Sequence, residues 1–169
     1  MKRSLIVLAV ILAAVGLFLG VSRLIVTDEE RIEAIVKEVS QAIANEDLAG
    51  CMRHVSDDFV YQPKHVNKAR LAAHVQQIFA RADDLKVTIS QLEIDVEGES
   101  ATITLRFRLL GAYVGRMDQF VGKRGFILGE PLKAARATLH LSKRPRTEAP
   151  AGGQAVWMLD RATEFNPGL

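Results

Sequence analysis

The stretch DEERIEAIVKEVSQAIANEDLAGCMRHVSDDFVY, residues 28–61, decides the fold. Its apolar residues recur at helical spacing as far as Ile43, and Thr27 and Glu30 have the spacing of a reciprocal N-terminal capping box. Residues 45–47 interrupt this helix. A shorter helix is predicted next, followed by a turn at 56–58 and a short strand at 59–61 that Pro63 ends. The buried side of the shorter helix is predicted to be Leu48, Cys51, Met52 and Val55.

The chain then changes from helical to strand periodicity. Asn67 can cap a third helix that extends to residue 79. Beyond residue 84, alternating apolar and polar residues predict four long strands, at 85–96, 102–109, 133–143 and 155–165, with a bulge near 90–91. Three helices followed by consecutive long strands predict an α+β fold, in which the helices are segregated against an antiparallel sheet.

Three pieces of the opening stretch resemble a known family. EAIV (33–36), AIANEDL (42–48) and SDDFVY (56–61) look like the opening of nuclear transport factor 2-like (NTF2-like) domains, which include SnoaL-like and ketosteroid-isomerase-like proteins. The resemblance covers residues 28–165. It implies a cone-shaped, cystatin-like fold, in which a strongly curved sheet wraps around a helix and leaves a cavity. The predicted NTF2-like domain is 27–169.

A continuous apolar run, SLIVLAVILAAVGLFLGVS, occupies residues 4–22. A helix of this length can cross a hydrocarbon core of ~30 Å. Lys2 and Arg3 favour a cytoplasmic N-terminus and a C-terminal domain that is periplasmic or extracellular. A cleaved signal peptide is the alternative. However, the apolar region of a typical signal peptide is shorter than this run and is followed by small residues at the cleavage site. We expect residues 1–26 to form a signal anchor, a single transmembrane helix in the inner membrane.

The charge of the remaining chain argues against nucleic-acid binding. Residues 1–26 hold three of the 22 basic residues and none of the 20 acidic ones, which leaves the rest with a net charge of −1. The only cysteine, Cys51, excludes an intramolecular disulfide. His54, His65, His74 and His140 do not have the spacing of metal ligands, so no metal and no cofactor are predicted.

The family's isomerase chemistry does not fit these residues. The resemblance implies a carboxylate base just after the short strand, where this chain has Gln62 and Pro63, and an oxyanion-stabilising tyrosine near Val39. Glutamine has no basic form near neutral pH. The best acid–base candidates are Tyr61 and His65, which flank the end of the short strand.

The small inward residues Ala135 and Ala137 can leave room for an apolar ligand, although close packing of the first helix would fill the same space. The expected cavity walls are large apolar side chains on the short strand, the third helix and the strand 102–109. They are Phe59, Tyr61, Phe79, Leu105, Phe107 and Leu109.

A second predicted surface is the outward face of the long strands. It carries Arg106, Arg108, Arg136 and His140, and could meet an acidic partner, anionic lipid or only solvent. The resemblance implies that this face can form a homodimer, but a row of like charges fits its own copy poorly. Residues 114–131 are too apolar for a solvated loop and are expected to pack as a lid, or against a partner or the bilayer. They add Phe120 and Phe126 to the partner surface.

Two functions remain open. The first is a membrane-anchored extracytoplasmic binding or assembly module that engages a protein partner or a small apolar ligand. The second is a small-molecule enzyme of the isomerase, dehydratase or cyclase class that uses the cone cavity. The missing catalytic set favours the first function.

Overall fold

The computed structural model describes residues 26–114, 124–130, 132–145 and 155–168. The expected anchor, residues 4–22, lies outside them, as does Phe120. Among the described residues, no helix has both the length and the apolar character needed to cross a membrane.

The order of elements confirms the α+β prediction. Helices come first and long strands follow, with one short 3-10 helix, η1, after the first strand. The helical elements are α2 (Asp28–Ala44), α3 (Leu48–Met52), η1 (Gln62–Lys64) and α4 (Lys68–Phe79). The strands are β1 (Val55–Tyr61), β2 (Val66–Asn67), β3 (Ala82–Glu97), β4 (Ser100–Tyr113), β5 (Arg124–Leu128), β6 (Ala135–Arg144) and β7 (Val156–Asn166).

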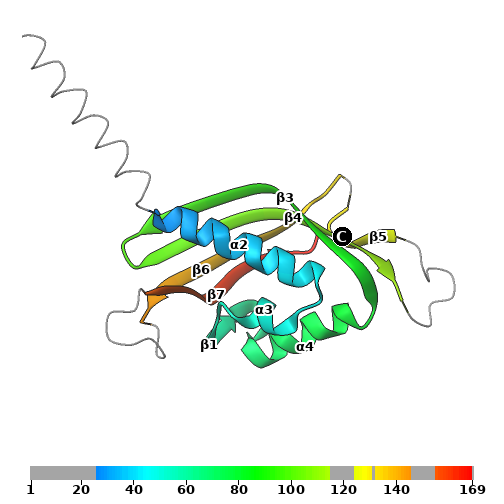
Figure 1. The fold of residues 1–169 in the computed structure, drawn as a ribbon, viewed down its shortest axis with the longest axis horizontal. Coiled ribbons are helices and arrows are strands. Elements are labelled where there is room, and N and C mark those ends of the chain that lie inside the picture. Colours follow the sequence, from blue (N-terminus) through cyan, green and yellow to red (C-terminus); the bar gives the residue numbers. More distant parts are fainter. Residues whose placement is uncertain (1–25, 115–123, 131, 146–154, 169) are drawn as a thin grey trace, which may run out of the picture.

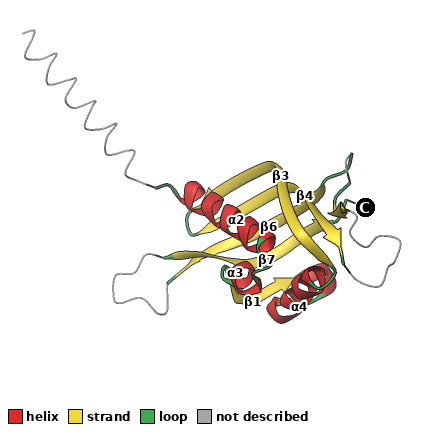
Figure 2. Ribbon diagram, turned by 45° about the vertical axis from the view of Figure 1, so that its right-hand side comes forward, coloured by secondary structure: helices red, strands yellow, loops and turns green. Residues whose placement is uncertain are grey.

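The strands form one sheet in the order β2-β1-β7-β6-β4-β3. β5 also pairs with β4, on the same edge as β6 and beyond the end of β6. The prediction of an antiparallel sheet is wrong at one point, because β1 pairs with β7 in parallel. Parallel neighbours need a long connection, and here the 94 residues 62–155 separate the two strands. Figures 1 and 2 show the sheet curving around α2, as the family resemblance implies.

Several local predictions are confirmed. Glu30 N donates to Thr27 Oγ1 at 3.2 Å and Thr27 N donates to Glu30 Oε2 at 3.0 Å, which completes the capping box of α2. Asn67 Oδ1 accepts from Arg70 N and caps α4. The register of β3 and β4 shifts between Ile89 and Gln91, where the bulge was expected.

Two boundaries differ from the prediction. The shorter helix ends at Met52, and the residues expected to form its end and the following turn instead start β1 at Val55. The β1–β7 register shifts between Val55 and Val60, so the exposed pair Asp57-Asp58 lies in an irregular part of the strand and does not alternate. Residues 114–131 are not wholly irregular, because β5 lies within them.

The core lies between the sheet and the helices, in three clusters. The first packs Ile32 of α2 against Ile103, Leu141 and Trp157 of the sheet. The second groups Val55, Phe59 and Ala162. The third groups Ala82, Leu85 and Leu109, with Ile127 of β5 beside them. Polar side chains of β4, β6 and β7 are left for the opposite face of the sheet.

Candidate functional site: a polar groove on the outer sheet face

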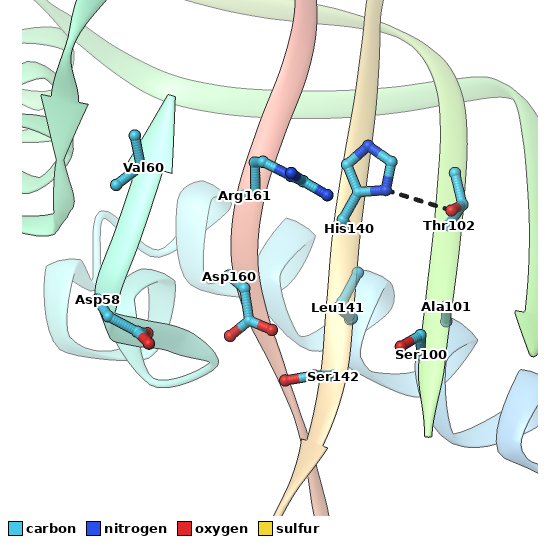
Figure 3. A pocket seen from close by; sticks show the side chains of 10 residues that line it. All are labelled: Asp58, Val60, Ser100, Ala101, Thr102, His140, Leu141, Ser142, Asp160 and Arg161. Atoms are coloured by element: carbon cyan, nitrogen blue, oxygen red, sulfur yellow. Dashed lines mark hydrogen bonds between the residues drawn. The ribbon is translucent and has the colours of Figure 1, made fainter. Parts of the chain in front are cut away.

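The sheet face turned away from the helices carries a groove of about 380 Å³. Figure 3 shows its walls, which come from four neighbouring strands, β1, β7, β6 and β4, with the helices behind. The residues lining it are Asp58, Val60, Ser100, Ala101, Thr102, His140, Leu141, Ser142, Asp160 and Arg161.

Strand alternation explains why these side chains gather here. On β6, Ala137, Leu139 and Leu141 point toward the core, so Thr138, His140 and Ser142 face outward. Register pairs share one face, and His140 lies opposite both Thr102 of β4 and Arg161 of β7. The same pairing places Arg161 outward next to Val60.

His140 is held between two hydroxyl groups. Its Nδ1 lies 3.3 Å from Thr102 Oγ1 and its Nε2 lies 3.0 Å from Thr163 Oγ1. Partial burial lowers the pKa of His140, and the nearby Arg161 guanidinium lowers it further. The imidazole is therefore neutral at pH 7, with one nitrogen that donates and one that accepts.

A cluster of charges forms the other end of the groove. Arg144 Nη2 bridges two carboxylates, at 2.9 Å from Asp58 Oδ2 and 2.7 Å from Asp160 Oδ1. Ser56 Oγ also donates to Asp58. These bonds, the one from Ser56 foremost, hold the pKa of Asp58 below its ordinary value, and the two carboxylates raise the pKa of Arg144. The cluster ties β1, β6 and β7 together.

This arrangement suits recognition of a polar ligand better than covalent chemistry. The groove offers hydroxyls, a neutral imidazole and the Arg161 guanidinium on one rigid sheet. Its carboxylates are already held by Arg144, and both ring nitrogens of His140 are already paired with threonine hydroxyls. No group of three or more potential metal ligands occurs in the described part of the chain.

The predicted partner surface adjoins this groove. Arg106 and Arg136 are direct neighbours on the outer face, and Arg108 Nε donates to the Glu130 carbonyl at 3.0 Å. Phe126 lies opposite Leu110 and is half-buried. A role for these residues in binding a partner stays a prediction.

Sequence reasoning missed the acidic edge of the same face. Register places Glu93, Asp95 and Glu97 of β3 beside Thr104, Thr102 and Ser100 of β4. The outer face is therefore divided into an acidic edge and a basic interior. The acidic residues alternate along the sequence of β3, but only the strand pairing shows which residues of β4 lie beside them.

The expected cavity walls are spread over the core. Phe59 and Tyr61 belong to the second cluster, Phe79 and Leu109 to the third, and Leu105 packs against the first. Phe107 is half-buried opposite Ala135. None of them lines the outer groove. A ligand cavity walled by these six residues stays a prediction.

The acid–base candidates Tyr61 and His65 lie at the two ends of η1. Tyr61 packs in the second cluster, whereas His65 is exposed in a left-handed conformation, with φ 51°. The His65 carbonyl accepts from Arg70 Nη1 at 3.2 Å. No hydrogen bond joins the two side chains in the described structure, and their catalytic role stays a prediction.

One pair of titratable side chains was not foreseen. His54 Nε2 lies 3.0 Å from Glu38 Oε2, and Arg53 also donates to Glu38. The His54 bond is the main reason why the pKa of Glu38 is lowered. His54 Nδ1 is buried and has no hydrogen-bond partner in the described structure. The two residues are 16 positions apart, a separation with no recognisable periodicity.

No protein-family model matches the chain, and no curated protein matches it in sequence. Solved structures do match it in shape. A dehydratase candidate of the NTF2-like family from Streptomyces avermitilis has a TM-score of 0.59 at 13% identity, over 80% of this chain and 94% of that one. The chain has the NTF2-like fold.

Two further structures with this fold support that conclusion. An NTF2-like superfamily protein from Salmonella enterica has a TM-score of 0.58 at 12% identity, over 82% of this chain and 89% of that one. An aromatic ring hydroxylase candidate from Novosphingobium aromaticivorans has a TM-score of 0.60 at 14% identity, over 80% of this chain and 86% of that one. Identities this low establish the NTF2-like fold and leave activity to be argued from the residues.

Proposed function

We propose that this chain is a membrane-anchored extracytoplasmic binding or assembly module with an NTF2-like domain. The observation that carries the binding role is the separation of its side chains: apolar clusters between helices and sheet, and a polar groove on the outer face. Small-molecule sites of proteins are usually concave and contain a few precisely placed polar groups.

The anchoring part of the proposal rests on residues 4–22. Nineteen consecutive residues without a charge are long enough to span a bilayer, and Lys2 and Arg3 precede them. The domain begins with the capped helix α2 directly after this segment. Partner surfaces on the domain would then be presented at a fixed side of the membrane.

Carbonate extraction of membranes tests the anchor. We expect the full chain to stay in the membrane pellet, because its N-terminal segment is buried in lipid. The double variant Val10→Arg/Leu12→Arg places two charges at the centre of the segment, where each costs about 3 kcal/mol for insertion. It should be extracted, whereas Ser4→Arg/Ser22→Arg, at the ends of the segment, should stay in the pellet. A wild-type chain found in the supernatant would overturn the anchor.

The enzyme alternative has two observations in its favour. Some neighbours in the structure comparison are named as dehydratase or hydroxylase candidates. The chain also has a histidine–carboxylate pair, His54 and Glu38, and His54 Nδ1 is buried without a hydrogen-bond partner among the described residues. Native mass spectrometry of the full chain released from detergent tests whether the domain holds a small molecule. A reproducible adduct would favour an enzyme or a carrier of small ligands, and its absence would favour a module that binds a protein partner.

A further inference from the structure

A second groove, of about 460 Å³, runs beside α4. Arg70, Ala73, His74 and Gln77 are spaced i, i+3, i+4 and i+7, so they form one stripe along α4, and all four are exposed. Lys64 from η1 and Val66 from β2 complete the lining. The groove therefore follows the helix for about two turns, roughly 10 Å.

The lining of this groove is basic. Lys64 and Arg70 are the basic residues among the lining, and no carboxylate lines the groove in the described structure. Lys68, the first residue of α4, is paired with Asp57 at 2.8 Å. Neither Lys64 nor Arg70 forms an ion pair with a described carboxylate. The hydrogen bond from Arg70 Nη1 to the His65 carbonyl holds the guanidinium near η1.

α4 is the least buried α-helix in the described part of the chain. None of its twelve residues is buried, whereas α2 buries Ile32 and Ala42, and α3 buries Gly50 and Cys51. A surface helix is normally stabilised by burying one apolar stripe against the core. On α4 even the core-facing Leu71 and Phe79 are only half-buried.

We propose that the α4 groove docks an acidic segment of a partner protein. Carboxylates of that segment pair with Lys64 and Arg70, and its apolar side chains lie on Val66 and Ala73. This inference rests on the proposed binding function and names the class of partner. Positive patches that meet negative ones steer association and suppress wrong partners.

The position of the groove favours a protein over lipid headgroups. The 17 residues of α2 extend about 25 Å from Asp28, next to the expected membrane exit, to Ala44. Figure 1 shows α4 near the C-terminal half of α2, away from that exit. If residues 4–22 span the bilayer, the groove stands off its surface.

Fluorescence anisotropy with a labelled peptide of alternating Glu and Leu residues tests the site. The protein is the full chain in nanodiscs of neutral phosphatidylcholine. Wild type should bind saturably, and Lys64→Glu/Arg70→Glu should weaken binding about tenfold or more, which corresponds to ~1.4 kcal/mol. The matched control, Lys37→Glu/Lys86→Glu, makes the same charge change at two exposed lysines outside the α4 groove and should alter binding less than about twofold.

A second variant tests whether binding depends on the shape of the groove, independently of its charge. Ala73→Trp fills the groove without changing any charge, and because Ala73 is exposed the fold should be retained, as circular dichroism would verify. It should abolish peptide binding. Equal weakening by both double variants, unaltered binding by Ala73→Trp, or no saturable binding by wild type would each overturn the inference.

Lipid is tested as a competitor. Empty nanodiscs of phosphatidylglycerol should not displace the peptide, and full displacement would assign the site to lipid headgroups and overturn the protein partner. Carbonate extraction does not depend on Lys64 or Arg70. Failure at this groove can therefore be distinguished from failure of the membrane-anchored function.

Discussion

At the scale of single residues, Asp28 joins the first described helix to the sheet. Its Oδ1 accepts from Trp157 Nε1 at 3.2 Å, and its Oδ2 accepts from Lys143 Nζ at 2.6 Å. Trp157 is 1% exposed, and Lys143 Nζ lies 5.2 Å from the centre of its ring. These contacts join the first turn of α2, directly after the expected anchor, to β6 and β7.

Asp28→Asn is expected to destabilise the domain by about 1–2 kcal/mol at pH 7, because the charge-assisted bond to Lys143 is lost. That bond is the main cause of the lowered pKa of Asp28. A lowered carboxyl pKa contributes stability above the unfolded-state pKa, and this stability disappears as the pH falls through the folded-state pKa. Urea unfolding of the full chain in nonionic detergent should therefore show a gap between wild type and variant that shrinks below pH 4.

Glu29→Gln is the control for this prediction. Glu29 is exposed, adjacent in sequence, and loses the same charge when substituted. It should change the unfolding free energy by less than about 0.5 kcal/mol at either pH. A constant gap between Asp28→Asn and wild type down to pH 3 would contradict the role given to the ionised carboxylate.

Residue-scale features differ in how far the sequence predicts them. The Thr27–Glu30 box and the Asn67 cap are local, so spacing alone identifies them. The Asp28–Trp157 and His54–Glu38 contacts join residues 129 and 16 positions apart. Only the packed fold brings such pairs together.

At the scale of elements, the pairing of β4 with β6 places two like charges side by side. Arg106 lies directly opposite Arg136 on the outer face. Opposite charges in this position stabilise a sheet by about 0.2–1 kcal/mol, and like charges destabilise it by a similar amount. The chain keeps this arrangement next to the polar groove.

Arg136→Glu should raise the unfolding free energy by about 0.5 kcal/mol, since it replaces repulsion by attraction across the two strands. Arg136→Gln removes only the repulsion and should give a smaller increase. Both gains should shrink in high salt, which screens exposed charges. Thermal unfolding at two salt concentrations measures this. A lower stability of Arg136→Glu at low salt would show that the two arginines do not repel each other.

Elements with clear alternation were predictable and irregular ones were not. The inward residues of β4 and β6 and the bulge of β3 follow from period-2 patterns. The start of β1 was missed because Asp57 and Asp58 break its alternation and resemble a turn. The pairing of β5 with β4 depends on a distant segment, which residues 124–128 alone do not specify.

At the scale of the whole molecule, the chain combines an NTF2-like fold with two charged grooves, one on the outer sheet face and one on α4. The α+β order was predictable, because helices and strands are segregated along the sequence. The parallel β1–β7 pair was not, since it joins the first and the last of the described strands, which are far apart in the sequence. The outer groove was not predictable either, because its position depends on the strand register, which periodicity does not provide.

We propose that this domain stands outside the cytoplasmic membrane, attached by residues 4–22. Glu99, in the exposed β3–β4 turn, is a suitable position for a reporter cysteine. The only native cysteine, Cys51, is buried, and burial raises the pKa of its thiol, so the wild-type chain serves as the unreactive control.

Labelling of Glu99→Cys in intact bacterial cells, with a maleimide that cannot cross the cytoplasmic membrane, tests this claim most directly. Lysed cells give the full extent of labelling. The proposed topology predicts equal labelling of intact and lysed cells expressing Glu99→Cys, and little labelling of wild type. Labelling of Glu99→Cys only after lysis would place the domain in the cytoplasm and contradict the account.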